Sequence, residues 1–273
     1  MLSDQVDFEV LFSPAERRAL QGFFWCAGRL VVSVLDDLQP SFLILEPTEG
    51  RWRRAELQGL PRNGVASVWP LGSLREESDG TLLAQAQDPV TPVRLMLTDV
   101  GLSAPVVLKE SSATFDAGGM MVTRHEAISV DGARIPYTQT GPADGGDGNA
   151  PLHLTGYGGF RVPSLPYYQA IQGKLWLELG GTTVVVNIRG GGEFGTPWHE
   201  AGRRERKHLS HDDFAAVATD LVRRGVTQPG RIAAEGASNG GLLIANMLTD
   251  IPSGLAHCPA PSRCSTCAAT PGC

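Results

Sequence analysis

Residues 235–250 read EGASNGGLLIANMLTD and place a serine between closely spaced glycines. The G-x-S-x-G pattern from Gly236 to Gly240 follows a strand-like segment and opens an apolar, helix-like one. A tight strand-to-helix turn leaves little room for side chains, which explains the flanking glycines. Such a turn exposes the hydroxyl of Ser238 at the edge of a sheet, beside the N–H groups of a helix N-terminus. The stretch therefore predicts a nucleophilic serine in an α/β domain.

The segments before this turn alternate between strand-like and helix-like patterns. GARIPYTQT and PLHLTG predict strands, and GGTTVVVNIRG predicts a strand buried on both faces of a sheet. SHDDFAAVATDLVRRG predicts a helix over residues 210–225, with Ser210 as its N-cap and an apolar stripe formed by Phe214, Val217 and Leu221. The alternation indicates a mostly parallel α/β sheet within residues 116–250.

Residues 1–115 have a different texture, which predicts an all-β region. Short apolar runs recur and are separated by turn-rich pieces such as PTEGRW and EESDG; the runs lie at residues 28–35, 41–47, 93–100 and 104–110. Regularly spaced short strands are typical of a sandwich, a barrel or a propeller, and the pattern alone does not choose among them.

Composition excludes several classes of function. The net charge of −6 gives no basic surface for nucleic acid, and no apolar run is long enough to span a bilayer. The N-terminus, MLSDQVDFEV, lacks the basic start and apolar block of a signal peptide. An odd number of cysteines, five, without such a peptide indicates reduced thiols. We therefore expect a cytoplasmic protein with no nucleic-acid or membrane partner.

Two further glycine-rich stretches precede the serine. LTGYGGF, at residues 154–160, directly follows a predicted strand, where hydrolases of this kind place a second oxyanion donor. NIRGGGEFGTPWHEAG, at residues 187–202, contains three consecutive glycines but no Gly-Lys-Ser/Thr, which excludes a P-loop. His199 precedes Ser238, whereas the histidine of these hydrolases follows the serine, so we expect a structural role for His199.

Taken together, GYGGF, NIRGGGEFG with PWHEAG, HDDFAAVATDLVRRGVTQP and GASNGGLL resemble the prolyl oligopeptidase family of serine peptidases in order and approximate spacing. SVDGARIPY resembles the entry to that family's hydrolase domain. LFSPAERRALQGFF and the strands after it resemble the last blades of its β-propeller. The resemblance implies a β-propeller remnant over residues 1–115, followed by a partial α/β-hydrolase domain over residues 116–250.

The resemblance also implies roles for individual residues. Ser238 would be the nucleophile, and the Tyr157 hydroxyl and the Asn239 backbone N–H would form the oxyanion hole. Phe160 would border the substrate pocket. Gly159 with Phe160, and Asn239, favour the prolyl oligopeptidase branch over the oligopeptidase B branch, which typically shows GYGAY and GSAGG. The implied function is a serine-type endopeptidase or oligopeptidase that hydrolyses short peptides after proline and needs neither a metal nor an organic cofactor.

The partners that a serine nucleophile needs are not evident in the sequence. All histidines except His257 precede Ser238, and His257 follows too closely to lie beyond the helix and strand that the fold requires between them. We therefore expect this chain to be inactive or nearly so, and peptide turnover that Ser238→Ala abolishes would contradict this. The alternatives are an esterase or acylaminoacyl-peptidase-like hydrolase on the same fold, and a non-catalytic remnant.

Residues 251–273 differ abruptly in composition and hold four of the five cysteines, with Cys264 and Cys267 as a C-x-x-C pair. Four thiolates could bind zinc, but the outer spacings do not form the usual paired knuckles. With suitably chosen codons for residues 250–270, the frame that starts at the third base of the Asp250 codon reads YPERFGALPGAVPLLDMRRY. This resembles how family members continue, so we expect an out-of-frame tail on a truncated chain.

Sequencing the coding DNA from the Ser238 codon past the stop tests this expectation. We expect that a single inserted or deleted base restores PERFGAL and VPLLDMRRY, with an Asp and a His further downstream. If the DNA instead confirms the frame as written, the cysteine-rich tail needs its own explanation. A non-catalytic remnant then becomes the favoured interpretation over a serine peptidase.

Overall fold

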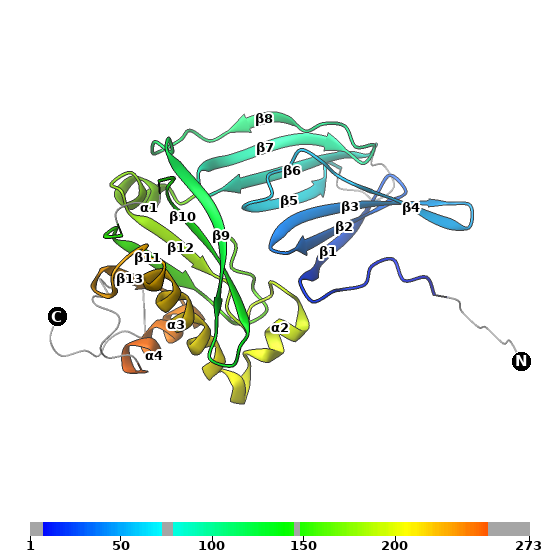
Figure 1. Cartoon of the computed structure of the whole chain (residues 1–273). Coiled ribbons are helices and arrows are strands. Elements are labelled where there is room, and N and C mark those ends of the chain that lie inside the picture. The colour runs from blue at the N-terminus through cyan, green and yellow to red at the C-terminus, as the bar shows by residue number, and fades with distance from the viewer. Residues whose placement is uncertain (1–7, 73–78, 145–147, 251–273) are drawn as a thin grey trace, which may run out of the picture.

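The computed structural model describes residues 8–72, 79–144 and 148–250, and this part of the chain forms three sheets (Figure 1). Two are four-stranded and antiparallel, and the third is five-stranded with helices packed on it. The expectations about the 251–273 tail, His257 and the cysteine pair lie outside the described residues.

Each antiparallel sheet is a meander in which successive strands are neighbours. The first contains β1 (Arg18–Cys26), β2 (Arg29–Asp36), β3 (Gln39–Thr48) and β4 (Arg51–Glu56). The second contains β5 (Val65–Pro70), β6 (Thr81–Asp88), β7 (Thr91–Asp99) and β8 (Val106–Glu110). The four apolar runs of the all-β region are thereby confirmed as β2, β3, β7 and β8. A shared apolar core joins the two sheets and includes Val31, Phe42, Ile44, Leu82 and Met96.

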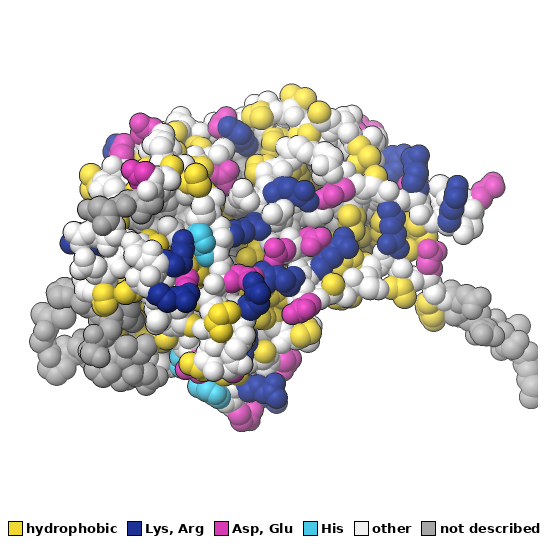
Figure 2. Space-filling view, in the orientation of Figure 1, with side chains coloured by type: hydrophobic (Ala, Val, Ile, Leu, Met, Phe, Trp, Pro, Cys, Tyr) yellow, Lys and Arg dark blue, Asp and Glu magenta, His cyan; other side chains and the backbone are white. Residues whose placement is uncertain are grey.

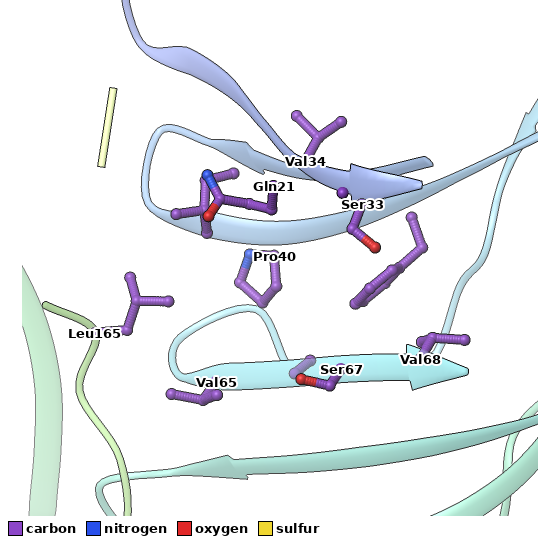
Figure 3. A pocket seen from close by; sticks show the side chains of 12 residues that line it. Gln21, Ser33, Val34, Pro40, Val65, Ser67, Val68 and Leu165 are labelled. Carbon is purple, nitrogen blue, oxygen red and sulfur yellow. The ribbon is translucent and has the colours of Figure 1, made fainter. Parts of the chain in front are cut away.

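A cavity of about 340 Å³ also lies between these two sheets (Figure 3). Its lining comes from β1 to β3, from β5 and from one loop residue, and includes Gln21, Ser33, Pro40, Ser67 and Leu165. None of its lining residues is ionisable, so the cavity offers no acid or base for chemistry.

The third sheet has the order β13-β11-β12-β10-β9 and is mixed. Its strands are β9 (Met120–Ile128), β10 (Arg134–Pro142), β11 (Leu152–Gly156), β12 (Thr182–Val186) and β13 (Ile232–Glu235). β11 is parallel to β12 and β13, whereas β10 is antiparallel to β9 and β12. The prediction of a mostly parallel sheet is therefore confirmed for β11, β12 and β13 and wrong for β9 and β10. A short turn joins β9 to β10 and permits only antiparallel pairing, while the longer crossovers allow parallel neighbours.

The longer helices are α3 (His208–Arg223) and α4 (Asn239–Asp250), and both pack on the same sheet (Figure 1). The predicted stripe of α3 is fully buried there: Phe214, Val217 and Leu221 contact a core that includes Leu152, Leu154, Val184, Leu243 and Met247. Shorter helical pieces are α1 (Ala170–Gln172), a π-helical turn (Gly173–Leu177), α2 (Thr196–Ala201), and 3-10 turns at Arg204–Arg206 and Pro229–Arg231. No helix in the described ranges has the length and apolar character needed to cross a membrane.

The start of α3 differs from the prediction. The helix begins at His208, and Ser210 lies inside it rather than at the N-cap. The Ser210 side chain is fully buried, and its Oγ donates a hydrogen bond to the carbonyl oxygen of Arg189 at 2.7 Å. Because that hydroxyl is engaged by a neighbouring loop, it is not used as a cap.

A buried ion pair joins α3 to the loop after β12. Asp213 is fully buried, and its Oδ1 lies 2.5 Å from Nη2 of Arg189. Asp213 also accepts hydrogen bonds from the Arg189 backbone N–H at 3.0 Å and from the Ser129 hydroxyl at 2.8 Å. Asp131, in the turn between β9 and β10, is a second partner of Arg189 at 2.5 Å. One guanidinium therefore connects the helix, the β9–β10 hairpin and the loop that contains the three glycines.

Charged side chains also link the first antiparallel sheet to the mixed sheet. Arg17 contacts Asp37 at 2.6 Å through Nε and Glu126 of β9 at 2.7 Å through Nη1. Nη1 of Arg124 donates to the carbonyl oxygen of Asp37 at 2.7 Å. Figure 2 shows basic and acidic side chains close together across the middle of this face. These contacts hold the two parts of the chain against each other.

We predict that Asp213→Ala lowers the free energy of unfolding by about 3–5 kcal/mol, because it leaves the buried Arg189 charge without its main partner. Asp212→Ala, one position away on α3 and only half-buried, is the matched control and should cost less than about 1 kcal/mol. Urea unfolding of both variants measures the difference. Equal losses for the two would show that the ion pair does not organise this region.

Candidate active site

The predicted serine lies on a tight turn between a strand and a helix. β13 ends at Glu235 and α4 begins at Asn239, so only three residues, 236–238, connect them. Ser238 has a φ of 53°, a left-handed conformation that costs a non-glycine residue about 1–3 kcal/mol. Its side chain is exposed. The strained turn therefore presents the hydroxyl at the edge of the sheet.

The glycines around Ser238 are required by close backbone contacts. A Cβ atom on Gly236 would lie 2.2 Å from the carbonyl oxygen of Gly240. A Cβ on Gly240 would lie 2.7 Å from the carbonyl oxygen of Gly156, the last residue of β11. Real Cβ atoms do not approach backbone this closely, so a larger residue at Gly236 would distort the turn itself, and a larger residue at Gly240 would push the turn away from β11.

This contact brings the loop after β11 next to the serine. Nδ2 of Asn239 donates a hydrogen bond to the carbonyl oxygen of Tyr157 at 2.5 Å. The Asn239 backbone N–H lies in the first turn of α4, where N–H groups have no acceptor within the helix. Tyr157 and Asn239, which the family resemblance implies would form one oxyanion hole, are therefore neighbours. No sequence pattern predicts the side-chain bond between them, because it joins residues far apart in the chain.

Phe160, expected to border the substrate pocket, lies in the same loop. It has a φ of 53° and is 75% exposed. Phe160 and Asn239 line a common cavity of about 300 Å³. The rest of its lining is mostly glycine or basic: Gly158, Gly159, Arg161, Gly190, His199, Gly202, Arg203, Arg204 and Lys207. The four predicted site residues are thus placed together, with a cavity beside them.

A second cavity, of about 570 Å³, lies on the Tyr157 side of the turn. Gly236 and Ala237 line it together with Tyr157. Val65, from β5 of the second antiparallel sheet, also reaches it. The serine turn therefore lies next to a space that both parts of the chain enclose.

Lys207 holds the loop at a point that no sequence pattern predicts. Its Nζ donates to the carbonyl oxygen of Gly158 at 2.6 Å. Burial lowers the pKa of the Lys207 ammonium. A lysine just before α3 carried no sequence signal for this contact, because its acceptor is a backbone atom of a distant loop.

The described histidines are engaged away from Ser238. Each makes a hydrogen bond to another group: His125 to Thr123, His153 to Glu235, His199 to the carbonyl oxygen of Gly190, His208 to that of Glu205, and His211 to Asn246. The bond from His199 Nδ1 to the glycine turn, at 2.7 Å, agrees with the structural role expected for it. Within residues 8–72, 79–144 and 148–250, Ser238 has no histidine partner.

Sequence comparison places this arrangement in a known family. Residues 168–254 match the model of the Prolyl oligopeptidase family. The chain is 37% identical over 244 residues to an uncharacterised peptidase of Sinorhizobium fredii, covering 89% of this chain and 33% of that protein. It is 30% identical over 194 residues to a prolyl endopeptidase of Elizabethkingia miricola, covering 71% and 27% respectively. The chain spans about a third of the length of the curated relatives it matches.

Solved structures agree with the sequence comparison. A post-proline cleaving enzyme from Rickettsia typhi superimposes with a TM-score of 0.82 at 27% identity, over 93% of this chain and 36% of that one. Prolyl oligopeptidase B from Galerina marginata, bound to a 25mer macrocyclization substrate, superimposes with a TM-score of 0.76 at 26% identity, over 88% and 33%. These matches confirm the expected fold class, with propeller-like antiparallel blades followed by part of a hydrolase domain. The chain belongs to the prolyl oligopeptidase family of serine peptidases.

Proposed function

We propose that this chain carries the nucleophile of a serine peptidase that hydrolyses short peptides after proline. The observation that carries the proposal is the exposed, left-handed Ser238 between the end of β13 and the start of α4. A non-glycine residue keeps such a conformation only where the surroundings impose it, and such positions concentrate at functional sites. Family membership supports acyl transfer as the chemistry that this turn serves.

In the proposed reaction, Oγ of Ser238 attacks the carbonyl carbon of the scissile peptide bond. The Asn239 N–H and the Tyr157 hydroxyl stabilise the resulting oxyanion. The amine then leaves, and water hydrolyses the acyl-serine. The hydroxyl proton must pass to a base and then to the leaving amine. Turnover therefore requires a base and an orienting carboxylate in addition to the groups placed around Ser238 here.

Specificity for proline is proposed from Phe160 and from the relatives. An exposed aromatic ring next to Asn239 offers a flat apolar surface, which suits the ring of a proline residue just before the cleaved bond. Two matched proteins are described as a prolyl endopeptidase and a post-proline cleaving enzyme. The stretches Gly159-Phe160 and Ser238-Asn239 support the prolyl oligopeptidase branch of the family.

The propeller-like sheets would restrict the size of the substrate. We infer that the boundary between the two domains falls in the segment between β8 and β9, near residue 115. Val65 of β5 lines the cavity that also contains Tyr157, so the all-β domain would cover one side of the site. A folded protein could not enter such a space, whereas a short peptide could.

We predict that a fluorophosphonate reagent labels Ser238 of the purified chain faster than it labels exposed serines in ordinary strands or helices. The reason is that the oxyanion donors stabilise the addition step, and a single such donor is worth about 100-fold or more. Peptide mapping by mass spectrometry locates the label and gives its rate. Ser238→Ala should remove it.

Ser67→Ala, at an exposed position on β5, is the matched control and should leave the labelling of Ser238 unchanged. Labelling of Ser238 no faster than that of Ser67 would count against the proposed nucleophile.

A further inference from the structure

The loop that follows β11 contains two strained residues in succession. Phe160 and Arg161 have φ values of 53° and 56°, in the left-handed region that non-glycine residues rarely adopt. Both side chains are exposed, so their own packing does not impose this shape. Such a conformation persists only when neighbouring groups hold it. The loop, residues 157–164, must therefore be fixed at its ends.

The first end is held by the two contacts already described, from Asn239 to Tyr157 and from Lys207 to Gly158. Ser164, at the other end, is hydrogen-bonded through both its backbone N–H and its carbonyl oxygen. Its N–H donates to Oε1 of Glu193 at 2.8 Å. Its carbonyl oxygen accepts a hydrogen bond from Nδ2 of Asn187 at 2.5 Å.

Glu193 reaches the loop because the glycines before it allow close contact. A Cβ on Gly192 would lie 2.0 Å from the carbonyl oxygen of Arg161, so the glycine turn packs directly against the strained residue. The Glu193 carboxyl is completely buried, and Asn187 Nδ2 also approaches its Oε1 at 3.4 Å. Asn187 is itself fixed, since its N–H donates to the carbonyl oxygen of Pro136 on β10 at 3.0 Å.

We propose that Glu193, together with Asn187, is a positioning residue that holds the 157–164 loop in the shape that places Tyr157 and Phe160 beside Ser238. The proposal rests on the proposed function in one respect: it assumes that these two residues serve the reaction at Ser238. The grip on Ser164 itself follows from the contacts alone.

The protonation state of Glu193 supports this role. Burial raises the pKa of its carboxyl from the usual 4.5 to about 7, although the Ser164 N–H and the Asn187 amide partly oppose the shift. Within the described residues, Glu193 Oε2 and Asn187 Oδ1 are both buried without a partner. A neutral carboxyl can donate a hydrogen bond from Oε2, and a glutamine at this position keeps a donor there.

The groups that face the carboxyl do not titrate. They are the Ser164 backbone, the Asn187 amide and the backbone of the glycine turn. Arg189, before that turn, is paired with Asp213 and Asp131. A change near neutral pH in the contacts that hold Ser164 would therefore reflect ionisation of the Glu193 carboxyl itself.

The direction of the pH effect follows from the raised pKa. The contribution of Glu193 to the stability of the closed loop is complete below about pH 4.5 and is lost as the pH rises through about 7. Above that pH the ionised carboxylate is buried without a cation, and local opening that hydrates it becomes favourable. The loop should therefore open more often in weakly alkaline solution.

Amide hydrogen exchange of the full chain tests the proposal, with rates corrected for the intrinsic effect of pH. Between about pH 6 and about pH 8 we expect the opening of residues 158–164 in the wild type to increase by about tenfold. Glu193→Gln should keep the loop protected at both values, and Glu193→Ala should leave it open at both. Glu200→Gln, on the exposed side of α2, is the control and should behave as the wild type.

Equal loss of protection in Glu193→Gln and Glu193→Ala would overturn the proposal, as would a wild-type loop whose opening does not change with pH. Loss spread evenly over the whole chain in both variants would also overturn it, since it would show an ordinary core role. If Glu193→Ala does not fold, the pH profiles of the wild type and Glu193→Gln decide alone. Exchange needs no reaction at Ser238, so it tests the grip even if the serine failed to label.

Discussion

The contact between the backbones of Gly240 and Gly156 is the constraint on which the candidate site depends. No side chain fits between the start of α4 and the carbonyl oxygen that ends β11. Because the two backbones meet, the side chain of Asn239 reaches the carbonyl oxygen of Tyr157. Within the turn, the close approach of Gly236 to Gly240 accompanies the left-handed conformation of Ser238. These two glycine contacts shape the turn that exposes the serine hydroxyl and bring the groups proposed to stabilise an oxyanion next to it.

A set of buried polar groups holds the loops next to this contact. Arg189 and Asp213 fix the loop after β12 to α3, and the glycine turn that follows places Glu193 under the 157–164 loop. The Arg189 guanidinium and the Glu193 carboxyl are both buried, which costs free energy. In this region they therefore order the backbone rather than contact substrate. Burying such groups lowers stability unless every partner is present. A single substitution among them should therefore destabilise the 157–164 loop.

Much of the fold follows from local patterns. The apolar runs predicted β2, β3, β7 and β8, and the stripe through Phe214 predicted the buried face of α3. The family resemblance implied that Ser238, Asn239, Tyr157 and Phe160 serve one site, and the structure places Asn239 against Tyr157 and beside a cavity that Phe160 also lines. The antiparallel half of the mixed sheet, the buried role of Ser210, and the contacts of Asn187, Lys207 and Glu193 depend on chain segments brought together only by folding. The catalytic roles and the domain boundary near residue 115 stay predictions.

The central claim is that the strand-to-helix turn and the loop after β11 act as one oxyanion site. The most direct measurement is the rate of fluorophosphonate labelling of Ser238 in Tyr157→Phe, compared with Tyr168→Phe as a control whose hydroxyl hydrogen-bonds to Thr114 instead. If the Tyr157 hydroxyl is a donor in that site, its removal should slow labelling by about 100-fold, while the control keeps the wild-type rate. Equal rates in the two variants would contradict the account, because the loop would then be a neighbour of the serine without sharing its chemistry.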